Sequence, residues 1–381
     1  MIYNIYILVY VIGGLIMMKY YAKDYIKSKR TDSESIRECL YDATECIGRK
    51  TIIFDSKDWY IDEAIILSDD TDVIIDGCMI KQNNYVFDNV FRGNNHIVDF
   101  KNPYGSPLLV GPIRNISIKG KNNARIVGCD INMRSRHFVL NQEQDMTGDF
   151  WGWRTYQILL SRCDNFEISD LELTQTRCWA MTFELCSHGN IHDISITSSV
   201  KNGDGIDFRA GCHDCRVDNI TGNTSDDTVA CTALFFGHNK FPYKNYLYTL
   251  EPALSVALEK SRSLDVHDIS INNVHTGGLC HGVICCAADG LKIYNIDIKN
   301  ISETSAGKRE ATVRIYTGYG ENYKDNDIHD ISIENVTSEF SKYAFMCTAK
   351  VSGVTVRNIK QNNSEGDAIS ISYPDGINAA V

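Results

Sequence analysis

Four groups of polar residues follow one another along the chain, and their side chains are of types that carry out acid–base chemistry. Asp204 belongs to the first group, Asp226 and Asp227 form the second, His281 lies in the third and Arg314 in the fourth. Paired carboxyl groups serve as general acid and base, and they commonly cleave glycosidic bonds. Such a pair stands about 6.5–9.5 Å apart in an inverting enzyme and about 5–5.5 Å apart in a retaining one.

Proximity would give each of these groups a distinct role. Clustered aspartates repel one another, which raises at least one pKa and keeps that carboxyl group protonated as an acid. The imidazole of His281 can tune or relay protons, and the planar fork of Arg314 suits a sugar carboxylate or hydroxyl groups. Taken alone, Asp226-Asp227 is typical of a solvated turn. The succession of all four groups favours a catalytic site.

A repeated unit determines how these groups are placed. It reads aliphatic, any residue, Asn or Asp, aliphatic, any residue, aliphatic, and most steps between units are about 25 residues. Two longer steps, of about 50 residues, are interpreted as two units each. The first residues of the units are Ile113, Ile168, Ile191, Val217, Val266, Ile293, Ile328 and Val356.

Each unit consists of short alternating apolar segments broken by Asn, Gly, Asp or Ser, which indicates strands rather than helix. The period is too short for a βαβ repeat of about 30 or more residues, and the leucine-rich-repeat signature is absent. Residues 31–381 are therefore predicted to form one all-β domain, a right-handed parallel β-helix. Its coils would lie about 4.8 Å apart, with the recurring Asn and Asp at left-handed turn positions. Asp204 and Asp226 would then face each other across about one coil.

The open end of a β-helix needs a cover. A short helix over Ser33–Gly48 is predicted to supply it, with Gly48 as its C-terminal cap. The end near Val381 shows no comparable signal. The apolar face of the predicted helix comprises Ile36, Cys39, Leu40, Ala43 and Ile47.

Two excursions interrupt the repeat: residues 127–153, which include Trp151 and Trp153, and residues 236–263, which include Lys240. Long loops on a rigid repeat scaffold usually build the binding face, so these three residues are candidates for contact with a sugar. Lateral packing of the aromatic rings on the wall of the coils is the alternative, and the sequence leaves both open.

Composition limits the function classes. The chain has 381 residues, 43% of them hydrophobic, and a net charge of −11, which argues against a nucleic-acid partner. No linker divides it, and we expect a monomer that binds a carbohydrate without a cofactor. The 14 cysteines suit the interior of a repeat fold as reduced thiols. Cys212 and Cys215 have a C-x-x-C spacing, but no second pair follows as in a zinc ribbon, so no metal site is predicted.

Residues 1–30 are predicted to lie outside the β-helix domain. Residues 1–16 are nearly all apolar but lack the basic start and small-residue cleavage site of a secretory signal, and they are short for a membrane span of about 20 residues. One hypothesis is a translation start at Met17 or Met18, which favours a cytoplasmic protein. The other is a short anchor followed by the basic run from Lys19 to Arg30, which implies a secreted or membrane-anchored protein.

In their order along the chain, the four polar groups resemble glycoside hydrolase family 28, the polygalacturonases, and the likeness spans roughly residues 110–360. The resemblance implies a pectin-lyase-like β-helix and an inverting hydrolase of pectic or other uronide polysaccharides. It implies that Asp226 is the general acid, that Asp204 and Asp227 activate water, that His281 holds their protonation state, and that Arg314 binds substrate. The matching motifs are Asn202-Gly-Asp204-Gly, Asp226-Asp227, His281-Gly282 and Arg314-Ile-Tyr316.

The chain departs from the family pattern at two positions. Gly203 replaces a threonine, and Tyr316 replaces a lysine that helps to bind the galacturonate carboxylate. Lys240 or His238 on the second excursion are candidates to replace that lysine, and another uronide, a rhamnogalacturonan fragment or a neutral sugar are alternative substrates. Two other functions remain open on this fold. One is a lyase or epimerase that uses Tyr316, His281 or Arg314, and the other is a non-catalytic, tail-spike-like carbohydrate-binding protein.

Overall fold

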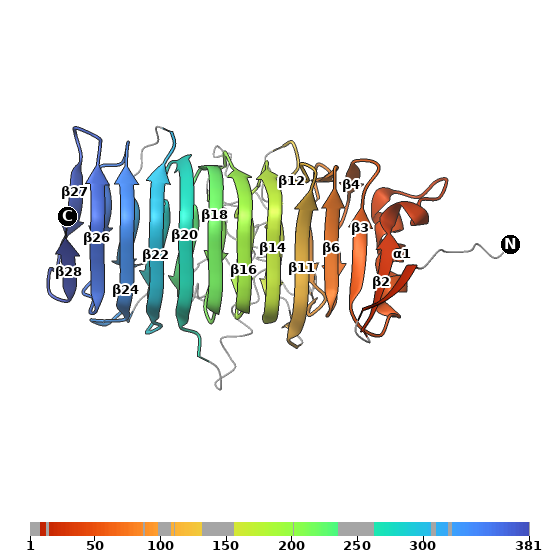
Figure 1. The fold of residues 1–381 in the computed structure, drawn as a ribbon, viewed down its shortest axis with the longest axis horizontal. Coiled ribbons are helices and arrows are strands. Elements are labelled where there is room, and N and C mark those ends of the chain that lie inside the picture. Colours follow the sequence, from red (N-terminus) through yellow and green to blue (C-terminus); the bar gives the residue numbers. More distant parts are fainter. Residues whose placement is uncertain are drawn as a thin grey trace, which may run out of the picture.

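The structure is a computed structural model that describes residues 8–12, 15–86, 88–97, 108–109, 111–131, 156–200, 202–234, 263–305, 310–318 and 322–380. In these residues the chain winds into an elongated solenoid whose strands stand side by side from one end of the molecule to the other (Figure 1). Successive coils pair through parallel strands in two long sheets. The predicted parallel β-helix is confirmed.

The first sheet has sixteen strands in the described residues. Three short strands lie beside its main path: β4 (Trp59–Ile61), β7 (Met79–Gln82) and β12 (Arg125–Val127). The strands of the main path, in spatial order, are β1 (Leu8–Ile12), β2 (Leu15–Tyr21), β3 (Lys50–Phe54), β6 (Thr71–Asp76), β11 (Ile113–Lys121), β14 (Cys163–Thr174), β16 (Ser187–Thr197), β18 (His213–Thr224), β20 (Val266–Gly278), β22 (Ile293–Glu303), β24 (Ile328–Ser338), β26 (Val354–Gln361) and β28 (Ile377–Ala380).

The second sheet forms another wall of the same coils and has ten strands in the described residues. A separate pair joins β9 (His96–Ile97) to β10 (Leu108–Leu109). In spatial order, the strands of the second sheet are β5 (Ile65–Leu67), β8 (Phe91–Gly93), β13 (Ile158–Ser161), β15 (Met181–Glu184), β17 (Ile206–Phe208), β19 (Val229–Ala233), β21 (Val283–Ala287), β23 (Ala311–Thr317), β25 (Tyr343–Cys347) and β27 (Asp367–Ile371).

The pairing register corrects the predicted phase of the repeat. Ile168 pairs with Ile118, not with the repeat start at Ile113, and Val217 pairs with Ile271, not with Val266. The motif therefore occurs in two registers five residues apart. The two long steps are also single coils and not two units each, because β11 pairs directly with β14 and β18 with β20.

The expectation about turn residues is confirmed. The Asn or Asp of every repeat unit has a positive φ, between 52° at Asp330 and 60° at Asp170. Short polar side chains tolerate this left-handed conformation better than other non-glycine residues. They also bond to the next coil, as when the side-chain amide of Asn165 donates to Oδ1 of Asn115 at 2.6 Å. The bends are thus fixed both by backbone conformation and by ladders of side-chain hydrogen bonds.

The interior is one continuous apolar core. Inward residues stack in register from coil to coil, as in the row of Ile168, Ile191 and Val217. Phe183 lies between Phe166 and Phe208, with ring centroids 4.7 and 5.6 Å away. Most cysteines are buried along the same core, and all 14 are free thiols.

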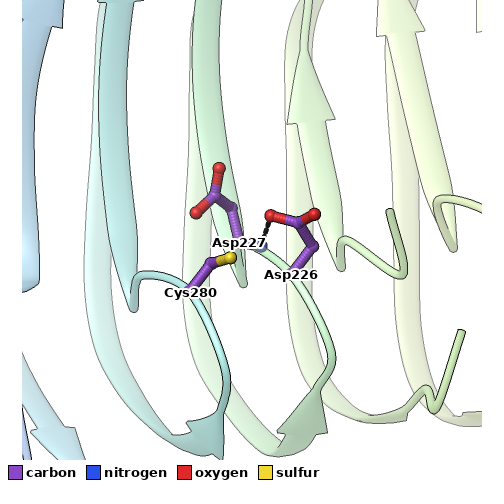
Figure 2. Close-up of side chains that lie close together, drawn as sticks. All are labelled: Asp226, Asp227 and Cys280. Carbon is purple, nitrogen blue, oxygen red and sulfur yellow. Dashed lines mark hydrogen bonds between the residues drawn. The ribbon is translucent and has the colours of Figure 1, made fainter. Parts of the chain in front are cut away.

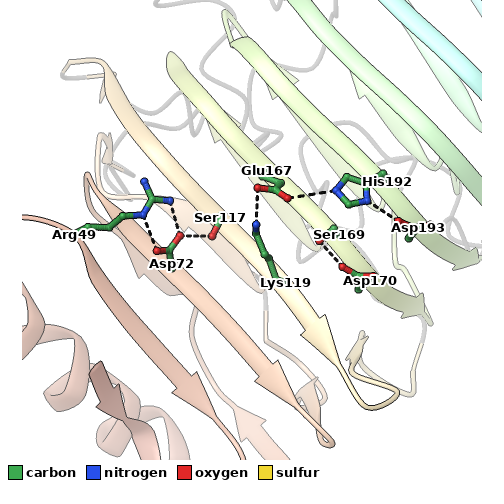
Figure 3. A network of polar contacts seen from close by, with 9 residues as sticks. All are labelled: Arg49, Asp72, Ser117, Lys119, Glu167, Ser169, Asp170, His192 and Asp193. Carbon is green, nitrogen blue, oxygen red and sulfur yellow. Dashed lines mark hydrogen bonds and ion pairs between the residues drawn. The ribbon is translucent and has the colours of Figure 1, made fainter. Parts of the chain in front are cut away.

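Polar networks cover part of the outer face of the first sheet (Figure 3). Arg49 donates two hydrogen bonds to Asp72, at 2.7 and 2.6 Å, from a neighbouring coil. Glu167 lies 2.6 Å from Nζ of Lys119 on one side and 3.4 Å from Nε2 of His192 on the other. Such contacts tie successive coils together on the side opposite the core.

The N-terminal cover is present, with different bounds from those predicted. The helix α1 (Asp32–Thr44) starts at a capping box formed by Thr31 and Glu34. Ile36, Cys39 and Ala43 belong to the same core cluster as the coils, as predicted. Ile47 is 95% exposed, so its placement on the buried face was wrong. The reason is that the helix ends at Thr44, before this residue.

The sheet extends further toward the N-terminus than residue 31. β2 pairs in parallel with β3, and Tyr20 joins the core together with Ala22 and Tyr25 of the 3-10 helix η1 (Ala22–Tyr25). β1 pairs antiparallel with β2. Among the described residues, none of the helices has the length and apolar character needed to cross a membrane.

Candidate active site

Three of the candidate residues occupy equivalent positions in three successive coils. Ile206, Val229 and Val283 are in register on β17, β19 and β21, and Asp204, Asp227 and His281 each lie two residues before them. The backbone continues this pairing into the turns, since Gly205 N donates to Asp227 O at 2.8 Å and Thr228 N to His281 O at 2.9 Å. The three residues therefore follow one another at about one coil spacing, 4.8 Å.

Asp226 precedes Asp227 on the same turn and faces the thiol of Cys280 from the next coil (Figure 2). One ligand atom each of Asp226, Asp227 and Cys280 lies within 4.8 Å of the others. Oδ1 of Asp226 accepts a hydrogen bond from the backbone N–H of Asp227 at 3.0 Å. Burial, followed by the charge of Asp227, raises the pKa of Asp226 from 3.8 to about 6. Asp226 therefore holds its proton to a higher pH than an ordinary aspartate does.

His281 is tied to Asp227 by two hydrogen bonds. Its Nδ1 lies 2.6 Å from Oδ1 of Asp227, and its backbone N–H donates to the same oxygen at 3.1 Å. The residue is 7% exposed, and its Nε2 is a buried atom without a hydrogen-bond partner among the described residues. The Asp227 contact orients the ring and leaves Nε2 as the atom that can meet a ligand or a water molecule.

The two glycines around Asp204 are required by close packing. A Cβ at Gly203 would lie 2.2 Å from Oγ of Ser225, and one at Gly205 would lie 2.4 Å from the carbonyl oxygen of Thr228. Ser198 fills the space beside Gly203, and its Oγ accepts a hydrogen bond from Ser225 N at 2.9 Å. The serine pair therefore leaves no room for a side chain at residue 203. Asn202 precedes this turn in a left-handed conformation, with φ 53°.

Three charged residues next to these turns were not among the predicted site residues. Asp207 alternates on β17 with the core residues Ile206 and Phe208, so it faces away from the interior, yet it is 1% exposed. Arg209 and Glu184 are equally buried, and all three have interaction partners. The signal available in the sequence was the alternation itself, because charged residues at outward positions of so short a strand need a reason to be buried.

Arg314 and Tyr316 lie on the same face of β23, two coils beyond β19. Arg314 pairs with Ile284 of β21, and Tyr316 pairs with Cys286. The guanidinium group lies 4.5 Å from the centroid of the Tyr316 ring, and its Nη1 lies 3.0 Å from Oε2 of Glu310. The structure thus places Arg314 on the same sheet as the aspartates, two coils beyond Asp227, with a carboxylate partner that the sequence did not indicate.

The remaining predicted substrate contacts belong to the two excursions from the repeat. Trp151, Trp153, Lys240 and His238 lie outside the described residues. In the part of the chain that the structure describes, Asp226, Asp227 and Cys280 form the one group of three His, Cys, Asp or Glu side chains with atoms close enough to hold a metal ion. Cys212 and Cys215 do not belong to such a group.

No family model matches the sequence, and no curated protein matches it either. Solved structures do resemble the fold. A "1,3-alpha-1,4-beta-D-galactose-4-sulfate-3,6-anhydro-D-galactose-2-sulfate 4 galactohydrolase" superposes with a TM-score of 0.59 at 12% identity, over 93% of this chain and 90% of that one. An exopolygalacturonase from Thermotoga maritima has a TM-score of 0.53 at 13% identity, over 95% and 91%.

A tailspike protein of Escherichia coli bacteriophage HK620, solved with a pentasaccharide, reaches a TM-score of 0.58 at 9% identity, over 95% of this chain and 67% of the tailspike. Identities this low show a common fold and no more. The chain therefore has the parallel β-helix fold found both in polysaccharide hydrolases and in tailspike proteins. The choice between these functions depends on the side chains described above.

Proposed function

We propose that this chain is a glycoside hydrolase that cleaves a polysaccharide or oligosaccharide with inversion at the anomeric carbon. The observation that supports this best is the succession of Asp204, Asp227 and His281 in adjacent coils, with Asp226 beside them. A non-catalytic binding protein has no need for several desolvated carboxyl groups on one wall, because their mutual repulsion costs stability.

In this proposal Asp226 is the general acid that protonates the leaving-group oxygen. Its raised pKa, about 6, keeps about a tenth of the molecules protonated at pH 7, far more than an ordinary aspartate would allow. Oxygen atoms of Asp226 and Asp227 lie within 4.8 Å of each other, closer than the separation of an inverting pair. Asp204, on the coil before that of Asp227, is therefore assigned as the base that activates water. Asp227 assists Asp204, and His281 orients the Asp227 carboxylate.

The test is product analysis with a panel of pectic and neutral oligosaccharides. We expect new reducing ends, and NMR of the first product formed should show an inverted anomeric configuration. A retained configuration would contradict inversion and would indicate a double-displacement mechanism, in which one carboxylate attacks the sugar directly. Unsaturated products that absorb in the ultraviolet would instead support a lyase, and binding without turnover would support a tailspike-like role.

A further inference from the structure

The positive charge of Arg314, on the outer face of β23, is balanced by a neighbouring carboxylate. Arg314 Nη1 lies 3.0 Å from Oε2 of Glu310, the residue that immediately precedes the strand. The same guanidinium group is stacked over Tyr316, 4.5 Å from the ring centroid. A planar cation held in this way has its charge balanced and its orientation fixed.

The surface around this pair is largely apolar. Ile284 lies beside Arg314 on the adjacent strand, and Met346 lies beside it on the other side. The Tyr316 ring packs against a small cluster of buried residues that is separate from the main core. This cluster consists of Leu234, Cys286 and Ala288.

The other carboxyl groups of this wall lie further away. Asp227 precedes β19, two coils from β23, and Asp204 and Asp207 belong to the coil of β17, three coils away. Arg209 is buried with its guanidinium group 4.9 Å from the centroid of the Trp179 ring. A uronate bound at Arg314 would instead meet the Glu310 carboxylate, 3.0 Å from the same guanidinium group, and like charges at such short range repel.

We propose that the subsite at Arg314 takes a neutral sugar residue rather than a uronate, an inference that rests on the glycoside hydrolase function proposed above. The Arg314 side chain is 23% exposed, so the guanidinium group can donate to a sugar hydroxyl group on its open side. The stacked Arg314–Tyr316 pair and its apolar surroundings form the platform, as in most small-ligand sites. This specificity differs from the uronide substrate that the sequence resemblance implies.

The decisive experiment uses pairs of glycans that differ in the carboxyl group alone. The probes are fragments of α-1,4-galacturonan, β-1,4-glucuronan and β-1,4-mannuronan, each compared with its carboxyl-reduced neutral form. For every pair that the full-length protein cleaves, kcat/KM should be at least about tenfold higher for the neutral member, because like charges at close range cost more than 1.4 kcal/mol. Equal or faster cleavage of a uronan would overturn the inference.

Variants identify the residues responsible. Glu310→Gln releases the charge of Arg314, and Tyr316→Lys adds a second cation, so each should reduce the preference for the neutral member. Ser370→Lys is the matched control, because Ser370 is in register with Arg314 through Met346, two coils further along the same face. At about 10 Å and physiological salt its charge is largely screened, so the preference should not change. An unchanged preference in both Glu310→Gln and Tyr316→Lys would remove these residues from the subsite.

Failure of the proposed function gives a different result from failure of this inference. If no glycan in the panel is cleaved, the hydrolase proposal fails for these linkages. The subsite is then judged by calorimetric binding of the same pairs. Tighter binding of neutral members would support the inference, and tighter binding of uronans, or no binding of any member, would reject it.

Discussion

At the scale of single residues, the proton on Asp226 makes the clearest prediction. With a pKa of about 6, this carboxyl group loses its proton as the pH rises past that value. A general acid is active when protonated, so kcat/KM should fall as the pH rises through about 6. Asp226→Asn should lower kcat by about 10²–10⁴-fold, the usual contribution of general acid–base catalysis. Rates of sugar release from pH 4 to 9 test both statements.

The same variant has a predictable effect on stability. Asp226 has a higher pKa in the folded protein than its ordinary 3.8, so the folded state binds the proton more tightly than the unfolded chain. The associated stabilisation is complete below about pH 4 and is lost as the pH rises through about 6. Asp226→Asn should therefore be at least as stable as the native protein at pH 7 in urea unfolding. A large loss of stability would mean that the activity defect is structural. Asp325→Asn, at an exposed site, is the control.

The candidate aspartates could be selected from the sequence because their spacing matched the coil period, whereas His281 was selected by its order among the polar groups, since a long excursion precedes it. Glu310 could not, since an acidic residue four positions before an arginine is common and its pairing depends on the bend before β23. Asp207 was not selected as a site residue because alternation along the three-residue strand β17 shows that its side chain points outward, but not that neighbouring groups cover it. Trp151, Trp153 and Lys240 remain predictions.

At the scale of the elements, the left-handed Asn ladder makes a prediction about folding energy. Asn300 has φ 57°, donates from its side chain to Oδ1 of Asn272 at 2.8 Å, and accepts from Asn335 at 2.9 Å. Asn300→Ala should cost about 2–3 kcal/mol, from about 1–2 for the left-handed backbone and about 1 for the lost hydrogen bonds. Urea unfolding measures this loss.

Asn300→Gly separates the two contributions. Glycine adopts the positive φ freely, so this variant should lose mainly the side-chain hydrogen bonds, at a cost of about 1 kcal/mol. Equal losses in Asn300→Ala and Asn300→Gly would show that backbone conformation contributes little at this bend.

The Gly203 turn makes a second prediction at this scale. Gly203→Ala brings a Cβ to 2.2 Å from Oγ of Ser225, and overpacking of this kind costs about 1–3 kcal/mol. Because Ser225 is the nearest obstacle, the double variant Gly203→Ala with Ser225→Gly should recover part of that loss. Unfolding free energies of the two single variants and the double variant give the coupling, and strict additivity would contradict the packing explanation.

The strands and bends also show which structural features the sequence repeat predicts and which it does not. The pattern of aliphatic residues with Asn or Asp predicted the strands and the sign of φ at the bends, because both are local properties. It did not predict the register, because the same motif fits two positions five residues apart on strands as long as β20 and β22. Pairing between coils decides between the two, and that depends on contacts distant in the sequence.

At the scale of the whole molecule, the continuous core determines how the 14 thiols behave. Twelve cysteines are buried, while Cys46 and Cys280 are partly accessible. Burial and the nearby charge of Asp226 raise the pKa of Cys280, which slows its reaction because the thiolate is the nucleophile. A bulky thiol reagent should therefore label Cys46 first and Cys280 slowly in the folded protein. Intact mass should show all 14 labelled in denaturant.

This labelling pattern tests the solenoid as one cooperative unit. The buried thiols are distributed from Cys39 in α1 to Cys347 in β25, so a segment of several coils that opens independently would expose cysteines of its own. We expect the core thiols to become reactive together as urea is raised, and Cys46→Ser to remove the fast phase alone. Stepwise labelling from one end would instead show that the coils unfold separately, as repeat proteins with weak coupling between neighbours do.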